Sequence, residues 1–274
     1  MRINTNVSSL TAQEAAQNTT KTLTSSLEKL STGLRINKAS DDASGLAIAD
    51  KLRTQATSIN QGIANGNSAV TLLQIADKSM AEQSNILDTV KAKLIQANTA
   101  TTSTDGRKAI ASDIAKLMTQ FDNIAKSTNY NGTDLISASA ADLDFQVGED
   151  STKGKITLTA IDSSASAYSL GALSSITSLT MASAATLQGT VDSAINSLNT
   201  NRGSIGSTQN QVESAVRNLM TMSTNVKAAE SIIRDVDYAA ESANFNKQNI
   251  ISQAGSYAIS QANSVQQNVL RLLQ

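Results

Sequence analysis

The chain has 274 residues, a formal net charge of −1, and no Pro, Cys, His or Trp. The absence of Cys excludes disulfides. The absence of both His and Cys excludes Ser-His catalysis, Cys-His catalysis and ordinary zinc sites. The near-neutral charge attracts neither nucleic acid nor an anionic membrane surface, so we expect neither as a partner. The absence of Pro over this length favours long, uninterrupted helices.

The N-terminal region predicts a helix whose apolar stripe needs a partner. Its apolar residues recur at spacings close to a heptad repeat, which in a coiled coil places them along one contact line. Gly33 stands near the end of the run, where glycine commonly terminates a helix. The predicted N-terminal seam consists of Ile3, Val7, Leu10, Leu23, Leu27, Leu30 and Leu34.

A short polar stretch follows this helix. Ser40, Asp41 or Asp42 is suited to cap the start of the next helix, where a carboxylate is favoured by the helix dipole. Asp41 and Asp42 could also form a metal or acid-base pair, but no further ligand stands near them in the sequence. The capping role is therefore the favoured interpretation, and we expect no metal or other cofactor.

The second helix is expected to be long. From Ile48 to Leu94 apolar residues keep a helical spacing that continues to about Asn98, which at 1.5 Å per residue predicts a helix of roughly 80 Å. Gly62 and Gly66 interrupt the pattern, and they favour either a bend or the close approach of another helix. After a polar loop at residues 99–106, a third helix is expected to return antiparallel to the second.

The middle of the chain changes character at the turn Asn129–Gly132. Apolar and polar residues alternate at Leu143–Val147 and again at Ile156–Leu158, which predicts a small β-hairpin. Ser163–Ala185 has no strong period and is expected to form a surface loop. Any O-linked glycan would be attached within its Ser/Thr-rich part, Ser163–Ser183. Helical spacing resumes at Leu187.

The last forty residues carry a second apolar stripe. Burying its four large members, Ile251, Val265, Val269 and Leu272, contributes about 6–12 kcal/mol at roughly 1.5–3 kcal/mol each. Ordering about 25 residues costs on the order of 1–2 kcal/mol per residue, so this helix needs cover from the N-terminal helix or from other copies of the chain. The predicted C-terminal seam consists of Ile251, Ala254, Ala258, Ala262, Val265, Val269 and Leu272.

These patterns predict a mainly α fold: a long antiparallel helical rod with coiled-coil terminal helices and a small β-hairpin at the far end. Residues 1–40 with 231–274 are expected to form the terminal coiled coil. Residues 41–130 with 187–230 would form the helical rod, and 131–186 the hairpin and surface loop. By periodicity alone the seams equally fit a monomeric bundle, but the small, amide-rich C-terminal stripe favours assembly.

Several long segments resemble the terminal signatures of bacterial flagellin, the subunit of the flagellar filament. The N-terminal ones are Ile3–Asn6, Leu27–Asn37 and Ser40–Ala49, and the C-terminal ones are Asp235–Ala239, Gln253–Gly255, Gln261–Asn263 and Gln267–Leu273. Their number and order make the resemblance specific. It implies that the terminal helices form the inner coiled-coil tube of a hollow helical filament, with the middle helices and hairpin in the next shell.

The resemblance also implies partners and a location. The partners would be other copies of the chain, the flagellar export apparatus and its chaperone, and the hook-filament junction and cap proteins. Export through the flagellum's own channel implies an extracellular filament without a cleavable signal peptide, whereas composition alone indicates the cytoplasm. Residues 131–186 are too few for large outer domains, so a thin, smooth filament is expected. The alternative is a related axial protein such as the hook-filament junction protein, and an enzyme is disfavoured.

One segment of the long helix departs from the family. Flagellins detected by the vertebrate innate-immune receptor typically read Gln-Arg-Val-Arg-Glu-Leu there, and Arg can make forked, charge-assisted hydrogen bonds. A Lys cannot reproduce that planar fork, so we expect a poor agonist. The aligned residues here are Asp88, Thr89, Val90, Lys91, Ala92 and Lys93.

Overall fold

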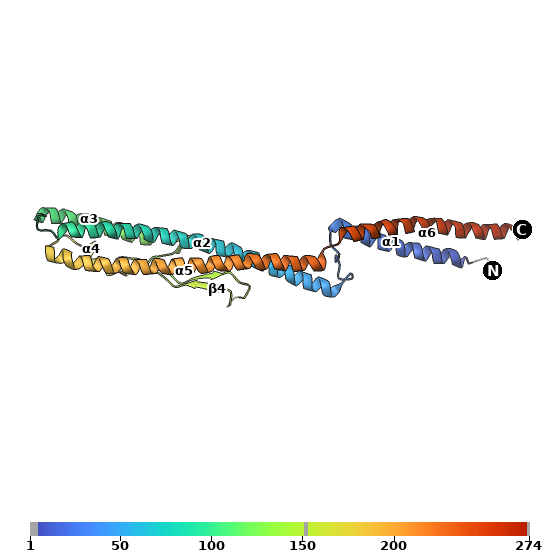
Figure 1. Ribbon diagram of the computed structural model, residues 1–274, viewed down its shortest axis with the longest axis horizontal. Coiled ribbons are helices and arrows are strands. Elements are labelled where there is room, and N and C mark those ends of the chain that lie inside the picture. Colours follow the sequence, from blue (N-terminus) through green and yellow to red (C-terminus); the bar gives the residue numbers. More distant parts are fainter. Residues whose placement is uncertain (1–4, 151–152, 273–274) are drawn as a thin grey trace. The chain divides into compact units, whose positions relative to one another are not determined.

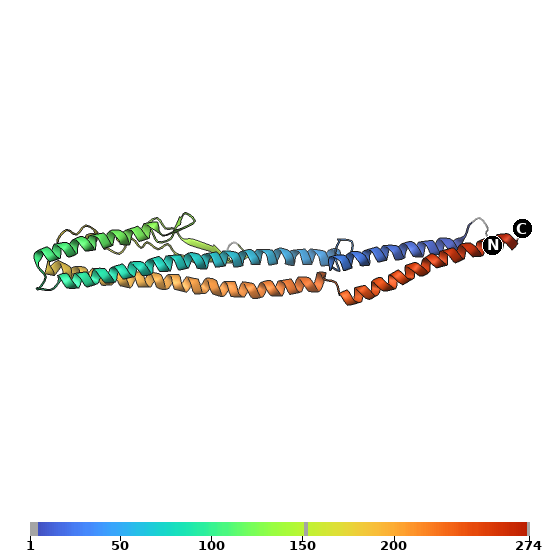
Figure 2. The same cartoon turned by 90° about the horizontal axis from the view of Figure 1, so that it is seen from above.

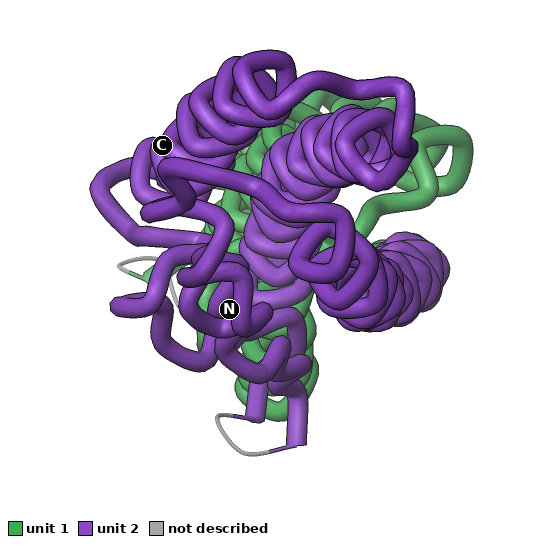
Figure 3. Tube along the Cα trace, turned by 90° about the vertical axis from the view of Figure 1, so that its left-hand side faces the viewer, with its two compact units in different colours: residues 1–56, 224–274 green, residues 57–223 purple. Residues whose placement is uncertain are grey.

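The computed structural model describes residues 5–150 and 153–272, and the chain divides into two compact units (Figure 3). One unit contains residues 1–56 and 224–274, and the other contains residues 57–223. The described chain is mostly helical with a few short strands, which confirms the predicted mainly α fold.

Long helices carry most of the described chain. They are α1 (Val7–Thr32), α2 (Ala43–Ala97), α3 (Thr104–Ser127), α5 (Met181–Arg234) and α6 (Tyr238–Leu272), and a four-residue helix, α4 (Gly171–Ser174), precedes α5. The strands are β1 (Asn129–Tyr130), β2 (Thr133–Asp134), β3 (Leu143–Gln146) and β4 (Lys155–Leu158). The boundaries between the two units fall inside α2 and α5.

The limits of α1 follow from capping chemistry. At its start the side chain of Asn6 accepts a hydrogen bond from the backbone N–H of Ser9 at 3.1 Å. At its end Gly33 adopts a left-handed conformation, with φ of 74°, and donates its N–H to the carbonyl oxygen of Lys29. Glycine adopts this conformation without a steric penalty, so the predicted stop at Gly33 is confirmed.

The start of α2 is held by the two neighbouring aspartates in different ways. Asp42 accepts a hydrogen bond from the backbone N–H of Gly45 at 2.9 Å, which confirms that it caps the helix. Asp41 instead accepts from the backbone N–H groups of Lys38 and Asn37, and these bonds hold the pKa of its carboxyl below its usual range. Both carboxylates therefore organise the backbone of the α1–α2 connection.

The core of the 57–223 unit lies between α2, α3 and α5, which run side by side (Figure 2). Large apolar residues of α2 and α5 recur every seven residues and are buried. They are Leu73, Met80, Leu87 and Leu94 on α2, and Val191, Leu198, Ile205, Val212 and Leu219 on α5. The apolar residues of the predicted pattern thus face the interior here, and α3 returns antiparallel to α2 as expected. Phe121 of α3 is fully buried, with its ring edge-to-face on Tyr168.

The predicted hairpin is present, with Leu143 paired to Leu158 and Phe145 to Ile156. Its expected position at the far end is corrected by the structure, because within this unit the α2–α3 turn at residues 98–103 forms that end. The hairpin instead packs along the side of α2.

Two glycines of α2 let other parts of the chain approach this helix closely, the hairpin at Gly62 and α5 at Gly66. A Cβ atom added to Gly62 would stand 2.2 Å from the carbonyl oxygen of Val147, so only glycine allows the strand's backbone to approach. The side chain of Asn65 then donates to the carbonyl oxygen of Gln146 at 3.0 Å. At Gly66 the added atom would meet Val216 of α5 at 2.4 Å, so this glycine admits a helix, as predicted.

The segment predicted as a surface loop, 163–185, is exposed at most of its residues, but buried residues anchor it to the core and its last part, from Met181, belongs to α5. Its buried residues are Ser163, Ser164, Ala165, Tyr168, Leu170, Leu173, Leu179 and Ala184. The buried side chain of Gln83 donates to the carbonyl oxygens of Ser163 and Phe121 at 3.0 and 3.1 Å, so the irregular backbone is satisfied without regular structure. α5 also begins earlier than the predicted Leu187, because Thr180 and Ser183 cap each other reciprocally.

Candidate assembly surface

α1 and α6 pair antiparallel within the 1–56/224–274 unit (Figure 1). Near one end the hydroxyl of Tyr238 donates to the carbonyl oxygen of Leu30, and near the other the side chain of Asn6 donates to that of Ala262 at 3.1 Å. The sequence left open whether the C-terminal helix is covered by the chain's own start, and the structure shows that this cover is partial.

The contact between α1 and α6 uses positions spaced alternately three and four residues apart. On α1 these inner positions are Ser9, Ala12, Ala16, Thr19, Leu23, Ser26 and Leu30, and on α6 they are Glu241, Phe245, Gln248, Ser252, Gly255, Ile259, Ala262 and Gln266. Most are small or polar. Ser26, 2% exposed, is the one buried residue that the described parts of these two helices contain. The pair therefore has almost no hydrophobic interior of its own.

The predicted C-terminal seam points away from α1. At 100° per residue its exposed members centre on a line about 100° around the helix from the inner positions. Ala262 is the exception, since it lies on the inner face, and the side chains of Val269 and Leu272 lie outside those that the structure describes. The exposed members are Ile251, Ala254, Ala258 and Val265.

The predicted N-terminal seam is divided between two faces. Leu23 and Leu30 face α6, and Leu34 is partly buried just beyond the end of α1. The remaining described members are Val7, Leu10 and Leu27, whose exposed fractions are 62%, 55% and 55%. Ile3 lies outside the described residues.

Sequence reasoning missed two large members of the exposed stripe on α6. Ile250 is 67% exposed and Tyr257, seven residues later, is 75% exposed. We define the outer apolar face of α6 as Ile250, Ile251, Ala254, Tyr257, Ala258 and Val265. The seven-residue spacing of Ile250 and Tyr257 was the available signal. Between Lys247 and Arg271 the sequence of α6 also has no charged residue, which is unusual for a helix face in water.

The connections next to this helix pair are tied together by backbone hydrogen bonds. The N–H of Arg35 donates to the carbonyl oxygen of Arg234 at 2.6 Å, and the N–H of Val236 donates to that of Gly33 at 3.0 Å. The guanidinium of Arg35 also donates to the carbonyl oxygen of Ile233 at 2.7 Å. The C-terminal ends of α1 and α5 are thus satisfied by each other's connecting segments.

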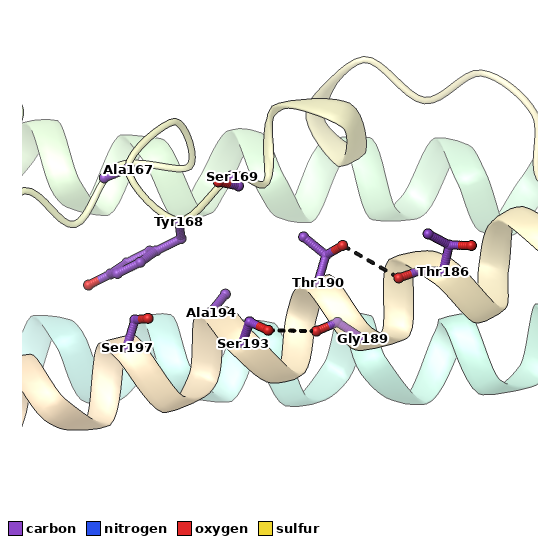
Figure 4. Close-up of a pocket in the computed structure, with 9 residues that line it drawn as sticks. All are labelled: Ala167, Tyr168, Ser169, Thr186, Gly189, Thr190, Ser193, Ala194 and Ser197. Atoms are coloured by element: carbon purple, nitrogen blue, oxygen red, sulfur yellow. Dashed lines mark hydrogen bonds between the residues drawn. The ribbon is translucent and has the colours of Figure 1, made fainter.

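The described residues contain no group of three or more acidic side chains able to hold a metal ion, and no described helix is long and apolar enough to cross a membrane. A groove of about 480 Å³ lies between Tyr168 and α5 (Figure 4). The hydroxyls of Thr190 and Ser193 on its wall donate to backbone carbonyls of their own helix. Tyr168 is the only titratable side chain lining the groove, so it offers no acid-base pair.

The segment predicted to have diverged from receptor-detected flagellins lies on α2. Val90 is fully buried in the core, so its side chain is not available to a partner. Lys91 forms an ion pair with Asp192 of α5 at 2.5 Å, and Lys93 forms one with Asp113 of α3 at 3.0 Å. The exposed residues of the segment are Asp88, Thr89 and Ala92.

Comparison with known proteins gives matches over most of the chain. Residues 3–141 match the bacterial flagellin N-terminal helical region, and residues 188–273 match the bacterial flagellin C-terminal helical region. A flagellin of Bacillus subtilis is 35% identical, and the flagellar filament 33 kDa core protein of Treponema phagedenis is 32% identical, each over the full length of both chains.

Other relatives match over a part of their length. Flagellin B of Helicobacter pylori is 48% identical over 147 residues, which are 54% of this chain and 29% of that protein. The chain thus spans less than a third of this longer relative. The crystal structure of Bacillus cereus flagellin superimposes with a TM-score of 0.51 at 26% identity, covering 61% of this chain and 94% of that one.

Proposed function

The chain belongs to the bacterial flagellin family, and on that premise we propose that it is a structural subunit that polymerises into a hollow helical flagellar filament serving motility. The observation that carries the proposal is the outer apolar face of α6, which stays exposed although α1 and α6 are paired. Apolar stripes of this length on a soluble protein mark interaction sites.

The helix pair lacks a hydrophobic interior of its own. Its inner positions are mostly small or polar, while large apolar side chains such as Ile250 and Tyr257 stay in solvent. Burial of each such side chain contributes about 1.5–3 kcal/mol, so neighbouring copies that cover the outer apolar face would supply the stabilisation that α1 alone does not. Residues 1–40 and 231–274 would then form the inner core of the filament.

The remaining helices would surround that core. Residues 41–130 and 187–230 supply the next shell, and its interior is already complete in one copy, as the buried heptads of α2 and α5 indicate. Residues 131–186 pack against these helices as a hairpin and an irregular segment anchored by buried residues. A chain without a larger insertion at this place would give a thin, smooth filament.

Further partners follow from the same family membership. We propose that the subunit passes through the flagellar export apparatus with its chaperone, without a cleavable signal peptide, and assembles outside the cell between the junction and cap proteins. We assign it no catalytic activity. The full-length relatives described above are named as a flagellin and a filament core protein, which favours a filament subunit over a hook-filament junction protein.

The decisive experiment is growth from seeds. Purified monomer is added to short filament fragments of the same protein and imaged by electron microscopy. We expect long filaments whose length increases with added monomer. A protein that binds the seed ends without elongating them would instead behave as a junction protein, and this result would contradict the proposal.

A further inference from the structure

Backbone hydrogen bonds between Gly33–Arg35 and Arg234–Val236 tie one end of the α1–α6 pair, and a slip of the helices must break them. What holds the register along the helices themselves, meaning which residue lies opposite which, is a separate question. Hydrophobic packing discriminates poorly here, because a slip of seven residues brings Ala262 opposite Ala16 in place of Gly255, one small residue for another. We propose that Ser26 and Glu241 fix the register and thereby act as positioning residues for the outer apolar face of α6. This inference deepens the proposed function and rests on it for its consequence in the filament.

The contact between these two residues is the best-enclosed feature of the helix pair. Ser26 is 2% exposed, and its hydroxyl donates to the Oε1 atom of Glu241. The side chain of Asn244 donates to the same oxygen at 3.3 Å. Hydrogen bonds to a carboxylate are stronger than those between neutral groups, and a polar residue at an inner coiled-coil position is a general device for specifying register.

The Ser26–Glu241 contact differs from the other hydrogen bonds between the two helices because its acceptor occurs only once on α6. Tyr238 and Asn6 both donate to backbone carbonyl oxygens, and such acceptors recur at every residue, so a slipped helix can offer others. Glu241 is the only acidic residue in the sequence of α6. A slip of one heptad places Gln248 opposite Ser26 and separates the hydroxyl from the carboxylate.

The chain offers a direct reporter of register, because it contains no cysteine. A Cβ atom on Gly255 would lie 3.7 Å from the Cβ atom of Ala16, within the disulfide range of about 3.5–4.5 Å. The pair Ala16→Cys with Gly255→Cys therefore reports the native register. The pair Ala16→Cys with Ala262→Cys reports a slip of one heptad. Gel mobility separates cross-links within one chain from those between chains.

The reporters are measured on the full-length chain, as monomer and after seeded growth. With no further change, we expect the native pair to cross-link within one chain and the slipped pair not to. Ser26→Ala or Glu241→Ala should raise the ratio of slipped to native cross-links about tenfold, which corresponds to about 1.4 kcal/mol. The double variant should show no larger change than either single variant, since both remove the same contact.

Two matched variants sharpen the test. Glu241→Gln keeps a carbonyl acceptor for Ser26 and should retain most of the native register. Glu14→Ala removes an exposed carboxylate from α1 and should leave the ratio unchanged. An unchanged ratio in both Ser26→Ala and Glu241→Ala overturns the inference, as does an equal change in Glu14→Ala or a native pair that fails to cross-link within one chain. Failure of the unaltered chain to form filaments counts against the proposed function alone.

Discussion

Val265 and Gln266 are neighbours on α6, yet Val265 is 52% exposed on the outer face while Gln266 is partly buried among the inner positions toward α1. A helix advances 100° per residue, so adjacent residues serve different contacts. A substitution at Val265 therefore tests the assembly surface. A substitution at Gln266 does not, because it perturbs the pairing of α1 with α6 within one chain.

A carboxylate on the outer apolar face should block assembly. In Val265→Asp an unpaired charge would enter a contact between copies, where the desolvation penalty amounts to several kcal/mol. Ser260→Asp is the matched control, because Ser260 is exposed on the polar side of α6 away from both faces. The measurement is motility in a strain lacking its own flagellin, at equal expression. Equal swimming of the two variants would contradict the assignment of the face.

Removing both terminal regions should abolish polymerisation and leave the rest folded. A chain from Leu34 to Ala229 lacks α1 and α6 but keeps the whole buried core of α2, α3 and α5. We expect a helical monomer by circular dichroism and sedimentation, with no elongation from seeds. Filaments grown from this shortened chain would show that the terminal helices are not the assembly elements.

Gly62→Ala should loosen the hairpin from α2. The new methyl group would overlap the carbonyl oxygen of Val147, and forced overpacking of this kind costs about 1–3 kcal/mol. Gly203→Ala provides the control, because Gly203 lies inside α5 with open space around it, and the change should stabilise the helix by about 0.5–1 kcal/mol. Thermal unfolding should move in opposite directions for the two variants; a shared direction would refute this account of hairpin docking.

Gln83→Leu should release the irregular segment from the core. The substitution leaves the carbonyl oxygen of Ser163 without its partner and removes the acceptor of the Ser163 hydroxyl, at about 1–3 kcal/mol for an unsatisfied group, while the carbonyl oxygen of Phe121 stays within α3. Amide exchange at residues 163–170 should accelerate. Gln74→Leu, on the exposed side of the same helix, should leave exchange there unchanged. Protection that survives in Gln83→Leu would indicate that apolar packing alone holds the segment.

The chain should be a weak agonist of the innate-immune flagellin receptor. Lys91 and Lys93 are engaged with Asp192 and Asp113, and neither offers the planar fork of Arg. Losing a forked contact at an interface centre costs on the order of 2 kcal/mol, or about thirtyfold in affinity.

The test is a receptor reporter assay on monomer. It compares the native chain with a variant carrying Asp88→Gln, Thr89→Arg, Lys91→Arg, Ala92→Glu and Lys93→Leu, checked for unchanged melting because two ion pairs are altered. Strong signalling by the native chain, or no gain in the variant, would argue against this interpretation.

The spacing of apolar residues was sufficient to predict both helix and buried side where those residues are covered by other parts of the same chain. The seven-residue spacing from Leu73 to Leu94 predicts a helix and the side it buries, and both are confirmed. For α6 the spacing correctly groups Ile251 with Val265 on one face, but periodicity does not say what covers a face. The structure turns that face away from α1 and places small and polar residues such as Gly255 inside.

The anchoring of residues 163–179 to the core could not be predicted from local pattern. The backbone of these residues is satisfied by Gln83, a residue 80 positions earlier in the chain, and by turns that have no repeat. The hairpin's position was equally non-local, because it depends on the absence of a side chain at Gly62. Sequence patterns report periodic burial, whereas these contacts arise from single residues that meet only in the folded chain.

The approach of Gly255 to Ala16 has a consequence on a larger scale. Two residues with almost no side chain set how closely the axes of α1 and α6 can lie. A bulkier residue such as Leu at position 255 would push the axes of the two helices apart. In a helical assembly of identical subunits every copy would carry the same displacement, and the added widths would sum around the circumference. The absence of a side chain at one position would thus govern the bore of the assembled tube.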